Sequence, residues 1–143
     1  MIDVGLTHIA LPVSDIEHSI QFYAVYANMQ VVHRRIDADT GIPVVWLSDG
    51  TRPFVIVLIQ QAEVTPILTP FAHLGIGCDS REAMDRLCDQ ALQADILIDG
   101  PTDSGYPVGY WAFLRDPDGH TLELSYGQEI GLTVEREASL SSS

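Results

Sequence analysis

The amino-acid sequence predicts an α+β fold made of two tandem βαβββ modules. Three observations support this prediction: an internal repeat, a helix-like apolar stripe after each copy of it, and three strand-like runs after each stripe. The repeat aligns residues 6–15 (LTHIALPVSD) with residues 71–80 (FAHLGIGCDS). Both segments are apolar, carry a histidine in the third place and end in a pair typical of a helix N-cap. We expect the curved sheets of the two modules to pair edge to edge around a half-open, barrel-like cleft.

Each half continues from the repeated segment into the same series of elements. Helices are expected at residues 16–26 and 81–92, where apolar side chains recur at helical spacing. Three strands then follow each helix, separated by turns rich in aspartate, glycine and proline. The strands are expected at residues 31–36, 43–47, 53–59, 95–98, 110–115 and 121–126, with turns at Asp39-Thr40-Gly41, Asp49-Gly50, Asp99-Gly100-Pro101 and Asp116-Pro117-Asp118-Gly119.

These elements define the expected domain organisation. Module one spans about residues 4–60 and module two about residues 70–127, with a polar link between them. Together they form a single domain over residues 1–131. Residues 132–143, which end in Ser-Leu-Ser-Ser-Ser, are expected to form a frayed, flexible tail.

Composition limits the classes of partner. The seven basic residues are all arginine, 20 residues are acidic, and the net charge is −13. Such a chain repels phosphate backbones and anionic lipids, so we expect neither a nucleic-acid nor a membrane partner. The absence of a long apolar run and of a signal-like N-terminus indicates a cytoplasmic protein. The acidity either keeps the protein soluble or forms a groove for a cationic ligand. Cys78 and Cys88 are too few for a disulfide framework and are expected to be buried or idle thiols.

Three residues suggest a metal site. The repeat places His8 and His73 at equivalent positions in the two sheets, so both should face the cleft if one does. Glu123 lies in a strand that otherwise looks buried, where a carboxylate needs a partner. Singly, each residue fits a structural histidine or an edge-strand carboxylate, but the repeat joins them into one pattern. Two imidazoles and one carboxylate suit Fe, Mn, Zn, Ni or Co and leave coordination positions open.

The two-module pattern, the two histidines and the segment FLRDPDGHTLEL at residues 113–124 resemble the vicinal oxygen chelate superfamily. This superfamily includes glyoxalase I, extradiol dioxygenases, fosfomycin-resistance enzymes, methylmalonyl-CoA epimerase and bleomycin-resistance proteins. The Phe22-Tyr23 pair also resembles its first module, and the resemblance covers about residues 5–127. It implies one divalent metal ion held by His8, His73 and Glu123.

The sequence departs from glyoxalase I and the epimerase, which take a fourth ligand from the last strand of module one. Aligning Asp49-Gly50 with Asp118-Gly119 puts Phe54 opposite Glu123, with Ile56 next on that face, and neither can bind metal. The three-ligand pattern is more similar to extradiol dioxygenases and fosfomycin-resistance enzymes.

Those two groups also use residues beyond the metal ligands. Fosfomycin-resistance enzymes bind a phosphonate through basic residues, whereas the arginines here are scattered apart from Arg34-Arg35, whose side chains should point to opposite faces. Extradiol dioxygenases add a second-sphere histidine and tyrosine. The candidates here are His33, Tyr106, Tyr110 and Tyr126.

With Glu123, we take Tyr110 and Tyr126 as the candidate catalytic residues. Tyr126 or Gln128, which follow the last strand, are candidates to reach the site from its rim. His120 follows a turn and is expected to be solvated. Residues 105–111 fit either a flap over the cleft or a long hairpin-like connection.

Two functions follow from these patterns. The first is a metal-dependent lyase, isomerase or ring-cleaving dioxygenase whose small substrate chelates the metal through vicinal oxygens. The alternative is a non-catalytic, bleomycin-resistance-like protein that sequesters a cationic ligand in an acidic cleft. A sequestering protein needs no metal ligands, so the His-His-Glu pattern favours the enzyme. The resemblance also implies a homodimer, since two-module members commonly pair.

Overall fold

The computed structural model describes residues 2–69 and 71–142. The chain divides into two compact units, and each contains one βαβββ module. Unit 1 consists of residues 1–72 with the turn 116–120, and unit 2 consists of residues 73–115 and 121–143. The predicted α+β fold with two tandem modules is therefore confirmed. The grouping of both modules into one domain over residues 1–131 stays a prediction.

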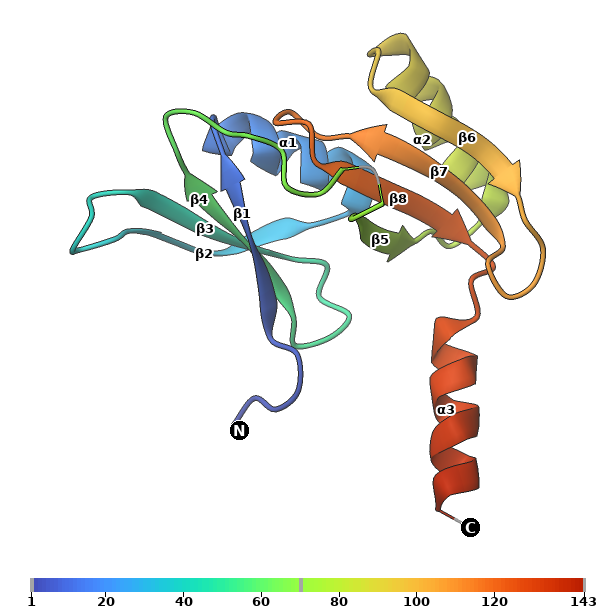
Figure 1. Ribbon diagram of the computed structural model, residues 1–143. Helices are drawn as coiled ribbons and strands as arrows, with labels where there is room; N and C mark the ends of the chain where they lie inside the picture. Colours follow the sequence, from blue (N-terminus) through green and yellow to red (C-terminus); the bar gives the residue numbers. More distant parts are fainter. Residues whose placement is uncertain (1, 70, 143) are drawn as a thin grey trace. The chain divides into compact units, whose positions relative to one another are not determined.

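Unit 1 is a four-stranded sheet with one helix (Figure 1). Its strands lie in the order β1-β4-β3-β2, with β1 parallel to β4 and the other pairs antiparallel. The elements are β1 (His8–Val13), α1 (Ile16–Ala27), β2 (Gln30–Ile36), β3 (Pro43–Ser48) and β4 (Val55–Gln60).

Strand alternation gives this sheet a face covered by α1 and a second face. Leu11, Leu47 and Leu58 are almost fully buried and pack beneath the apolar side of α1, which includes Tyr23. The helix begins after Asp15, whose side chain accepts a hydrogen bond from the His18 amide. The second face carries His8, Ala10, Trp46 and Val57.

The turn at residues 116–120 is held inside unit 1 by buried polar contacts. The Tyr23 hydroxyl donates to Asp116 Oδ2 at 2.8 Å, and both side chains are buried. Burial raises the pKa of the Asp116 carboxyl, while the hydrogen bond from Tyr23 opposes that rise. Burial and the neighbouring Asp116 also hold the pKa of Tyr23 well above its usual value.

The prediction that His120 is a solvated turn residue was wrong. His120 is fully buried in unit 1, with Nε2 3.0 Å from the Pro12 carbonyl and Nδ1 3.3 Å from the Ile67 amide. Since Nδ1 accepts from an N–H, Nε2 carries the proton and donates to Pro12. Both ring nitrogens are thus satisfied by backbone groups, which allows a neutral imidazole to be buried.

Unit 2 repeats the four-stranded arrangement and adds a C-terminal helix (Figure 1). The strand order is β5-β8-β7-β6, with β5 parallel to β8. The elements are β5 (Leu74–Gly77), α2 (Arg81–Gln93), β6 (Leu97–Asp103), β7 (Tyr110–Arg115), β8 (Thr121–Tyr126) and α3 (Ile130–Ser141).

Helix α2 covers one face of this sheet. Met84, Cys88 and Ala91 are buried, as are Leu114 and Leu122 on the strands beneath them. Burial raises the pKa of the Cys88 thiol to about 11 and also raises that of Cys78, so neither thiol is activated. Both cysteines are free, in agreement with the sequence expectation.

Two parts of unit 2 differ from the predicted elements. Strand β6 runs through the turn expected at Asp99-Gly100-Pro101, with irregular register on both sides of Asp99. Gly100 has φ +86°, and a Cβ there would lie 2.7 Å from the Trp111 carbonyl oxygen. The turn signal therefore marks a bulge within a strand.

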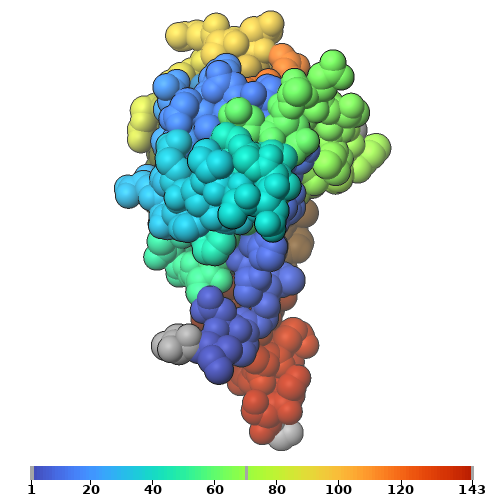
Figure 2. Space-filling view, turned by 90° about the vertical axis from the view of Figure 1, so that its left-hand side faces the viewer, coloured from blue at the N-terminus to red at the C-terminus, as the bar shows by residue number. Residues whose placement is uncertain are grey.

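The second difference is α3, where the sequence predicted no element. None of its residues is buried, and the space-filling view shows its surface in red open on the face drawn (Figure 2). Among the described residues, no helix is long and apolar enough to cross a membrane.

Candidate metal centre

Unit 2 brings His73 and Glu123 together. His73 directly precedes β5, and Glu123 lies in the middle of β8, where it pairs with Gly75 on one side and Phe113 on the other. His73 Nε2 and Glu123 Oε2 are 2.9 Å apart. Glu123 is 8% exposed. The expectation that this buried carboxylate has a partner is confirmed.

A second partner holds the other oxygen of Glu123. The Gln128 side-chain amide donates to Glu123 Oε1 at 3.2 Å. Gln128 follows the end of β8, so the expectation that it reaches the site from the rim agrees with this contact. The two contacts fix the carboxylate from opposite sides, as groups around a metal ligand commonly do.

The surroundings of the pair are aromatic. Alternation along β7 places Trp111 and Phe113 on the same face as Glu123, away from α2. The ring centroids of His73 and Phe113 are 5.0 Å apart, and those of Trp111 and Phe113 are 4.9 Å apart. These rings displace water around the carboxylate, which strengthens its interaction with a positive charge. This aromatic surface was not predicted from the sequence, because it depends on the register between β7 and β8.

The spacing of the pair fits a metal ion. The separation of 2.9 Å between His73 Nε2 and Glu123 Oε2 is that of a direct ion pair or hydrogen bond. Two neighbouring ligands about 2.1 Å from an octahedral ion lie about 3.0 Å apart, so the same spacing is compatible with such an ion. A nitrogen and a carboxylate oxygen also form the mixed donor set that Fe, Mn, Co, Ni and Zn accept.

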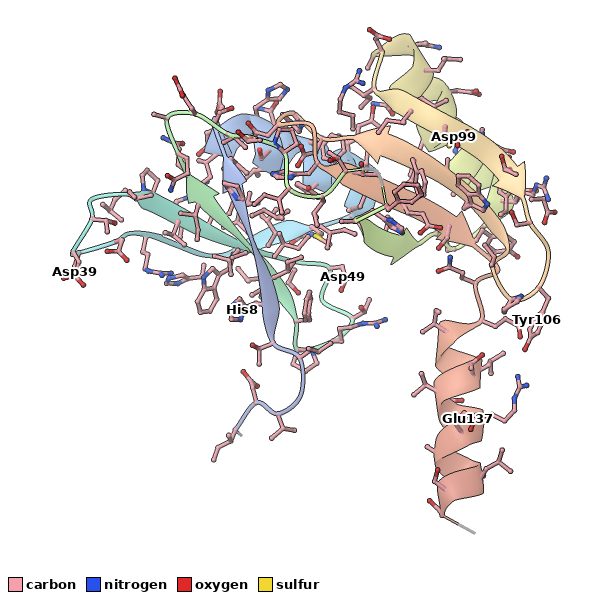
Figure 3. The ribbon with its side chains drawn as sticks, viewed as in Figure 1. His8, Asp39, Asp49, Asp99, Tyr106 and Glu137 are labelled. Atoms are coloured by element: carbon pink, nitrogen blue, oxygen red, sulfur yellow. The ribbon has the colours of Figure 1, made fainter. Side chains whose placement is uncertain are left out.

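His8, the third predicted ligand, lies in unit 1. It is the first residue of β1 (Figure 3), and its Nδ1 is 2.9 Å from Thr7 Oγ1. A hydroxyl on Nδ1 leaves Nε2 as the nitrogen for a metal. Within residues 2–69 and 71–142, no three His, Cys, Asp or Glu side chains are grouped as a metal-binding cluster. The structure therefore brings together two of the three predicted ligands.

The position in module one that corresponds to Glu123 is occupied by Val57. Ala10 on β1 pairs with Val57, as Gly75 on β5 pairs with Glu123. The alignment that chose Phe54 and Ile56 was wrong, because Asp49 directly follows β3, whereas Asp118 lies deeper in the β7–β8 turn. Valine cannot ligate a metal, so the departure from the four-ligand pattern remains.

Tyr110 and Tyr126 are not brought together with Glu123. Tyr126 lies three positions from Glu123 along β8, and Tyr110 pairs with Tyr126 across the β7–β8 ladder. Both tyrosines therefore lie on the opposite face of the unit 2 sheet from Glu123. The Tyr110 hydroxyl donates to Asp85 on α2, and this hydrogen bond raises the pKa of Tyr110. The Arg81 guanidinium lies 3.9 Å from the centre of the Tyr110 ring. This placement gives no support to a catalytic role beside Glu123.

The remaining candidates lie in several places. In unit 1, His33 packs on Trp46 with ring centroids 4.7 Å apart, while Arg34 binds Glu17 and Arg35 lies over the Trp46 ring. The adjacent arginines thus point to opposite faces, as predicted. In unit 2, Tyr106 is exposed on the connection between β6 and β7 (Figure 3). These strands are antiparallel neighbours, so the connection has the hairpin-like form that was one of the two expected alternatives.

Comparison with known proteins assigns the family. The sequence model of the Glyoxalase/Bleomycin resistance protein/Dioxygenase superfamily matches residues 5–124. The chain is 37% identical over 129 residues to an uncharacterised protein of Pseudomonas aeruginosa, covering 88% of this chain and 91% of that one. It is 28% identical over 137 residues to a probable lactoylglutathione lyase of Vibrio parahaemolyticus, covering 91% and 96%. This chain therefore belongs to the glyoxalase/bleomycin resistance protein/dioxygenase superfamily, as the sequence resemblance indicated.

Solved structures show the same fold. The trypanothione-dependent glyoxalase I of Leishmania major gives a TM-score of 0.72 at 24% identity, covering 98% of this chain and 99% of that one. A mutant of the fosfomycin resistance protein FosX of Listeria monocytogenes, complexed with Mn(II) and a dihydroxypropylphosphonic acid, gives 0.70 at 16% identity, covering 93% and 99%.

Proposed function

We propose that this protein is a divalent-metal-dependent enzyme whose small substrate chelates the metal through two vicinal oxygens. The observation that supports this most is the 2.9 Å approach of His73 Nε2 to Glu123 Oε2 on an aromatic sheet face. In the proposal, His8 is the third ligand, and the metal is Fe, Mn, Zn, Ni or Co. A relative named probable lactoylglutathione lyase and a structural neighbour that contains Mn(II) are consistent with it.

Each residue of the pair has a defined task in this proposal. His73 and Glu123 provide two neighbouring ligands, and Gln128 holds the carboxylate in the orientation that presents Oε2. Phe113 and Trp111 exclude water from one side of the substrate. The bound metal would act as a Lewis acid on the substrate oxygens. Three protein ligands leave room for two substrate oxygens, which suits a lyase, an isomerase or a ring-cleaving dioxygenase.

Val57 limits the number of protein ligands in the proposed metal site. Because valine stands where a fourth ligand from β4 would lie, the proposed site uses three protein ligands. We also propose that the enzyme works as a cytoplasmic homodimer, as the sequence led us to expect. The three ligands of one site then come from one chain or from both.

Elemental analysis of untagged protein tests the proposal. We expect about one equivalent of metal in the parent and a loss of that metal in His8→Ala, His73→Ala and Glu123→Ala. His18→Ala is the matched control, because His18 is exposed on α1, the helix that covers the opposite face of the unit 1 sheet from His8. A parent that stays metal-free after reconstitution with each of the five ions would contradict the proposal.

The net charge of −13 favours one alternative. An acidic protein of this superfamily would attract a cationic ligand and could sequester it without chemistry. Calorimetry with a cationic glycopeptide and metal-stripped protein distinguishes the two functions. If the protein sequesters the glycopeptide, substitution of His8, His73 or Glu123 should leave the binding unchanged, and added salt should weaken it.

A further inference from the structure

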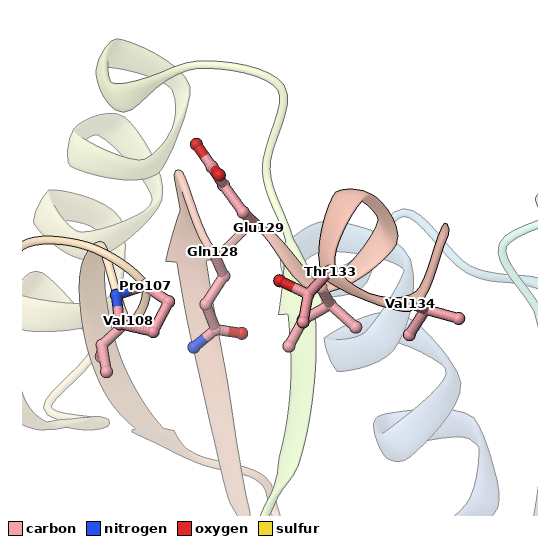
Figure 4. A pocket seen from close by; sticks show the side chains of 7 residues that line it. Pro107, Val108, Gln128, Glu129, Thr133 and Val134 are labelled. Carbon is pink, nitrogen blue, oxygen red and sulfur yellow. The ribbon is translucent and has the colours of Figure 1, made fainter. Parts of the chain in front are cut away.

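A cavity in unit 2 is lined by Gln128, the residue that donates a hydrogen bond to Glu123. Its volume is about 330 Å³, and it opens between the β6–β7 connection and the first turns of α3 (Figure 4). Most of its lining is apolar, and of the lining side chains only Glu129 is ionisable. The other lining residues are Pro107, Val108, Gln128, Ile130, Thr133 and Val134.

One wall of the cavity is built by the hairpin. The Gly109 amide donates to the Gly105 carbonyl at 2.7 Å, and the Ser104 amide donates to the Gly109 carbonyl at 2.9 Å. Gly109 has φ +79°, and a Cβ there would lie 2.6 Å from the Tyr126 carbonyl oxygen. The glycine thus lets the hairpin approach the end of β8 closely and holds Val108 in the wall.

The other wall is the helix that the sequence did not predict. Ile130, Thr133 and Val134 line the cavity and are spaced i, i+3 and i+4, so they lie on one side of α3. Thr133 and Val134 are labelled in Figure 4. Ile130 is 63% exposed and Val134 is 62% exposed. The helix has 12 residues, none of them buried, and no side-chain cap at its start. Isolated helices of this length are marginal in water, so a ligand that covers these side chains would stabilise α3.

Gln128 connects the cavity with the metal ligands. Its side chain lines the cavity and also donates to Glu123 Oε1 at 3.2 Å. Figure 4 shows it between the hairpin residues and those of α3. A ligand with two oxygens near Glu123 would therefore pass Gln128 and extend into the cavity.

We propose that this cavity binds an apolar substituent of the substrate, either a short alkyl chain or a phenyl ring, carried by the carbon framework that bears the vicinal oxygens. The inference rests on the proposed function. The volume suits such a group, since small-molecule sites begin at about 300 Å³. The cavity lining contains no arginine, and Glu129 disfavours an anionic substituent. The substrate class is therefore an apolar diol, dicarbonyl or hydroxycarbonyl compound.

Three probes separate the two halves of the site. Catechol has the vicinal oxygens, 4-propylphenol has the chain, and 4-propylcatechol has both. Their dissociation constants are measured by calorimetry without oxygen, on Zn(II)-loaded and on metal-stripped full-length protein. Each buried methylene strengthens binding about fourfold. We therefore expect the Zn(II)-loaded protein to bind 4-propylcatechol at least about tenfold more tightly than catechol.

Val134→Trp fills the cavity from α3, and Leu132→Trp is the matched control because Leu132 is exposed on the same helix but does not line the cavity. We expect Val134→Trp to abolish the preference for 4-propylcatechol over catechol. Leu132→Trp should keep the preference.

The outcomes distinguish the cavity from the metal site. Equal affinity of the parent for catechol and 4-propylcatechol would overturn the inference. Binding of 4-propylphenol that Val134→Trp abolishes, without any binding of catechol to the Zn(II)-loaded protein, would support the apolar site and contradict the proposed metal enzyme. If Val134→Trp shifts the monomer–dimer equilibrium in sedimentation and leaves the probe affinities unchanged, the cavity is covered by a second copy and the inference fails.

Discussion

Replacing Tyr23 with phenylalanine removes one buried hydroxyl and leaves Asp116 Oδ2 without its 2.8 Å donor. The Oδ1 atom keeps the amides of Asp118 and His120, each at 2.9 Å. A lost hydrogen bond to a charged, buried group costs about 1.5–3 kcal/mol of unfolding free energy. For a chain of this size, that cost lowers Tm by roughly 4–10 °C.

The loss of unfolding free energy caused by Tyr23→Phe should depend on pH. Burial raises the pKa of Asp116 and the Tyr23 hydrogen bond lowers it, so the variant should have a higher Asp116 pKa than the parent. When the pKa of a carboxyl is higher in the folded state, the protein loses stability as pH rises from the unfolded-state pKa of about 3.9 through the folded-state pKa. Relative to the parent, the variant should therefore lose more stability at about pH 7 than at about pH 4.

Thermal unfolding followed by circular dichroism at both pH values measures this difference. Tyr26→Phe is the control, since Tyr26 is a buried tyrosine on the same helix that packs on the Phe22 ring. It should change the unfolding free energy by less than about 0.5 kcal/mol. An equal loss of Tm at both pH values in Tyr23→Phe would refute the assignment of the effect to the ionised Asp116.

Three further predictions follow from the contacts described. Gln128→Leu removes the donor to Glu123 and should weaken metal affinity about tenfold or more, measured by competition with a chromophoric chelator; unchanged affinity would show that the contact does not orient the ligand. Val57→Glu places a carboxylate at the position equivalent to Glu123, and we expect tighter metal binding in the same assay, whereas weaker binding would contradict the assigned equivalence. His120→Phe leaves two partly buried backbone partners unsatisfied and should lower stability by about 2–4 kcal/mol in urea unfolding, while His33→Phe, at a half-buried stacked position, should cost much less.

Much of the fold could be predicted from the sequence because the repeat sets the order of elements twice. Strands β7 and β8 have the predicted bounds, and helices α1 and α2 each extend one residue further than predicted. Periodicity and capping residues are local signals, and in these elements they agree with the tertiary environment.

The misses have different physical origins. Asp99-Gly100-Pro101 looked like a turn, but glycine at positive φ also serves a bulge where a neighbouring backbone approaches closely. His120 looked solvated because it follows a turn, whereas its burial depends on the carbonyl of Pro12 and the amide of Ile67, which are distant in sequence. Helix α3 was not predicted, because the serine-rich end of the chain is typical of a flexible tail.

The candidate site was predictable in part. A buried glutamate required a partner, and His73 is that partner. Strand alternation alone could have separated the tyrosines from Glu123, since Tyr126 lies three residues further on the same strand and thus on the other face. The alignment of Phe54 with Glu123 failed because the two Asp-Gly pairs occupy different places in their turns, which only strand register reveals.

Pulsed EPR of the Mn(II)-loaded protein tests the central claim, namely that His8, His73 and Glu123 hold one metal ion. Directly bound imidazole nitrogens give resolved couplings, and the number of bound histidines follows from their amplitude. The account predicts two such nitrogens in the parent, one in His8→Ala, one in His73→Ala, and two with weakened binding in Glu123→Ala. A parent spectrum without imidazole nitrogen, or two nitrogens that persist in His73→Ala, would contradict it.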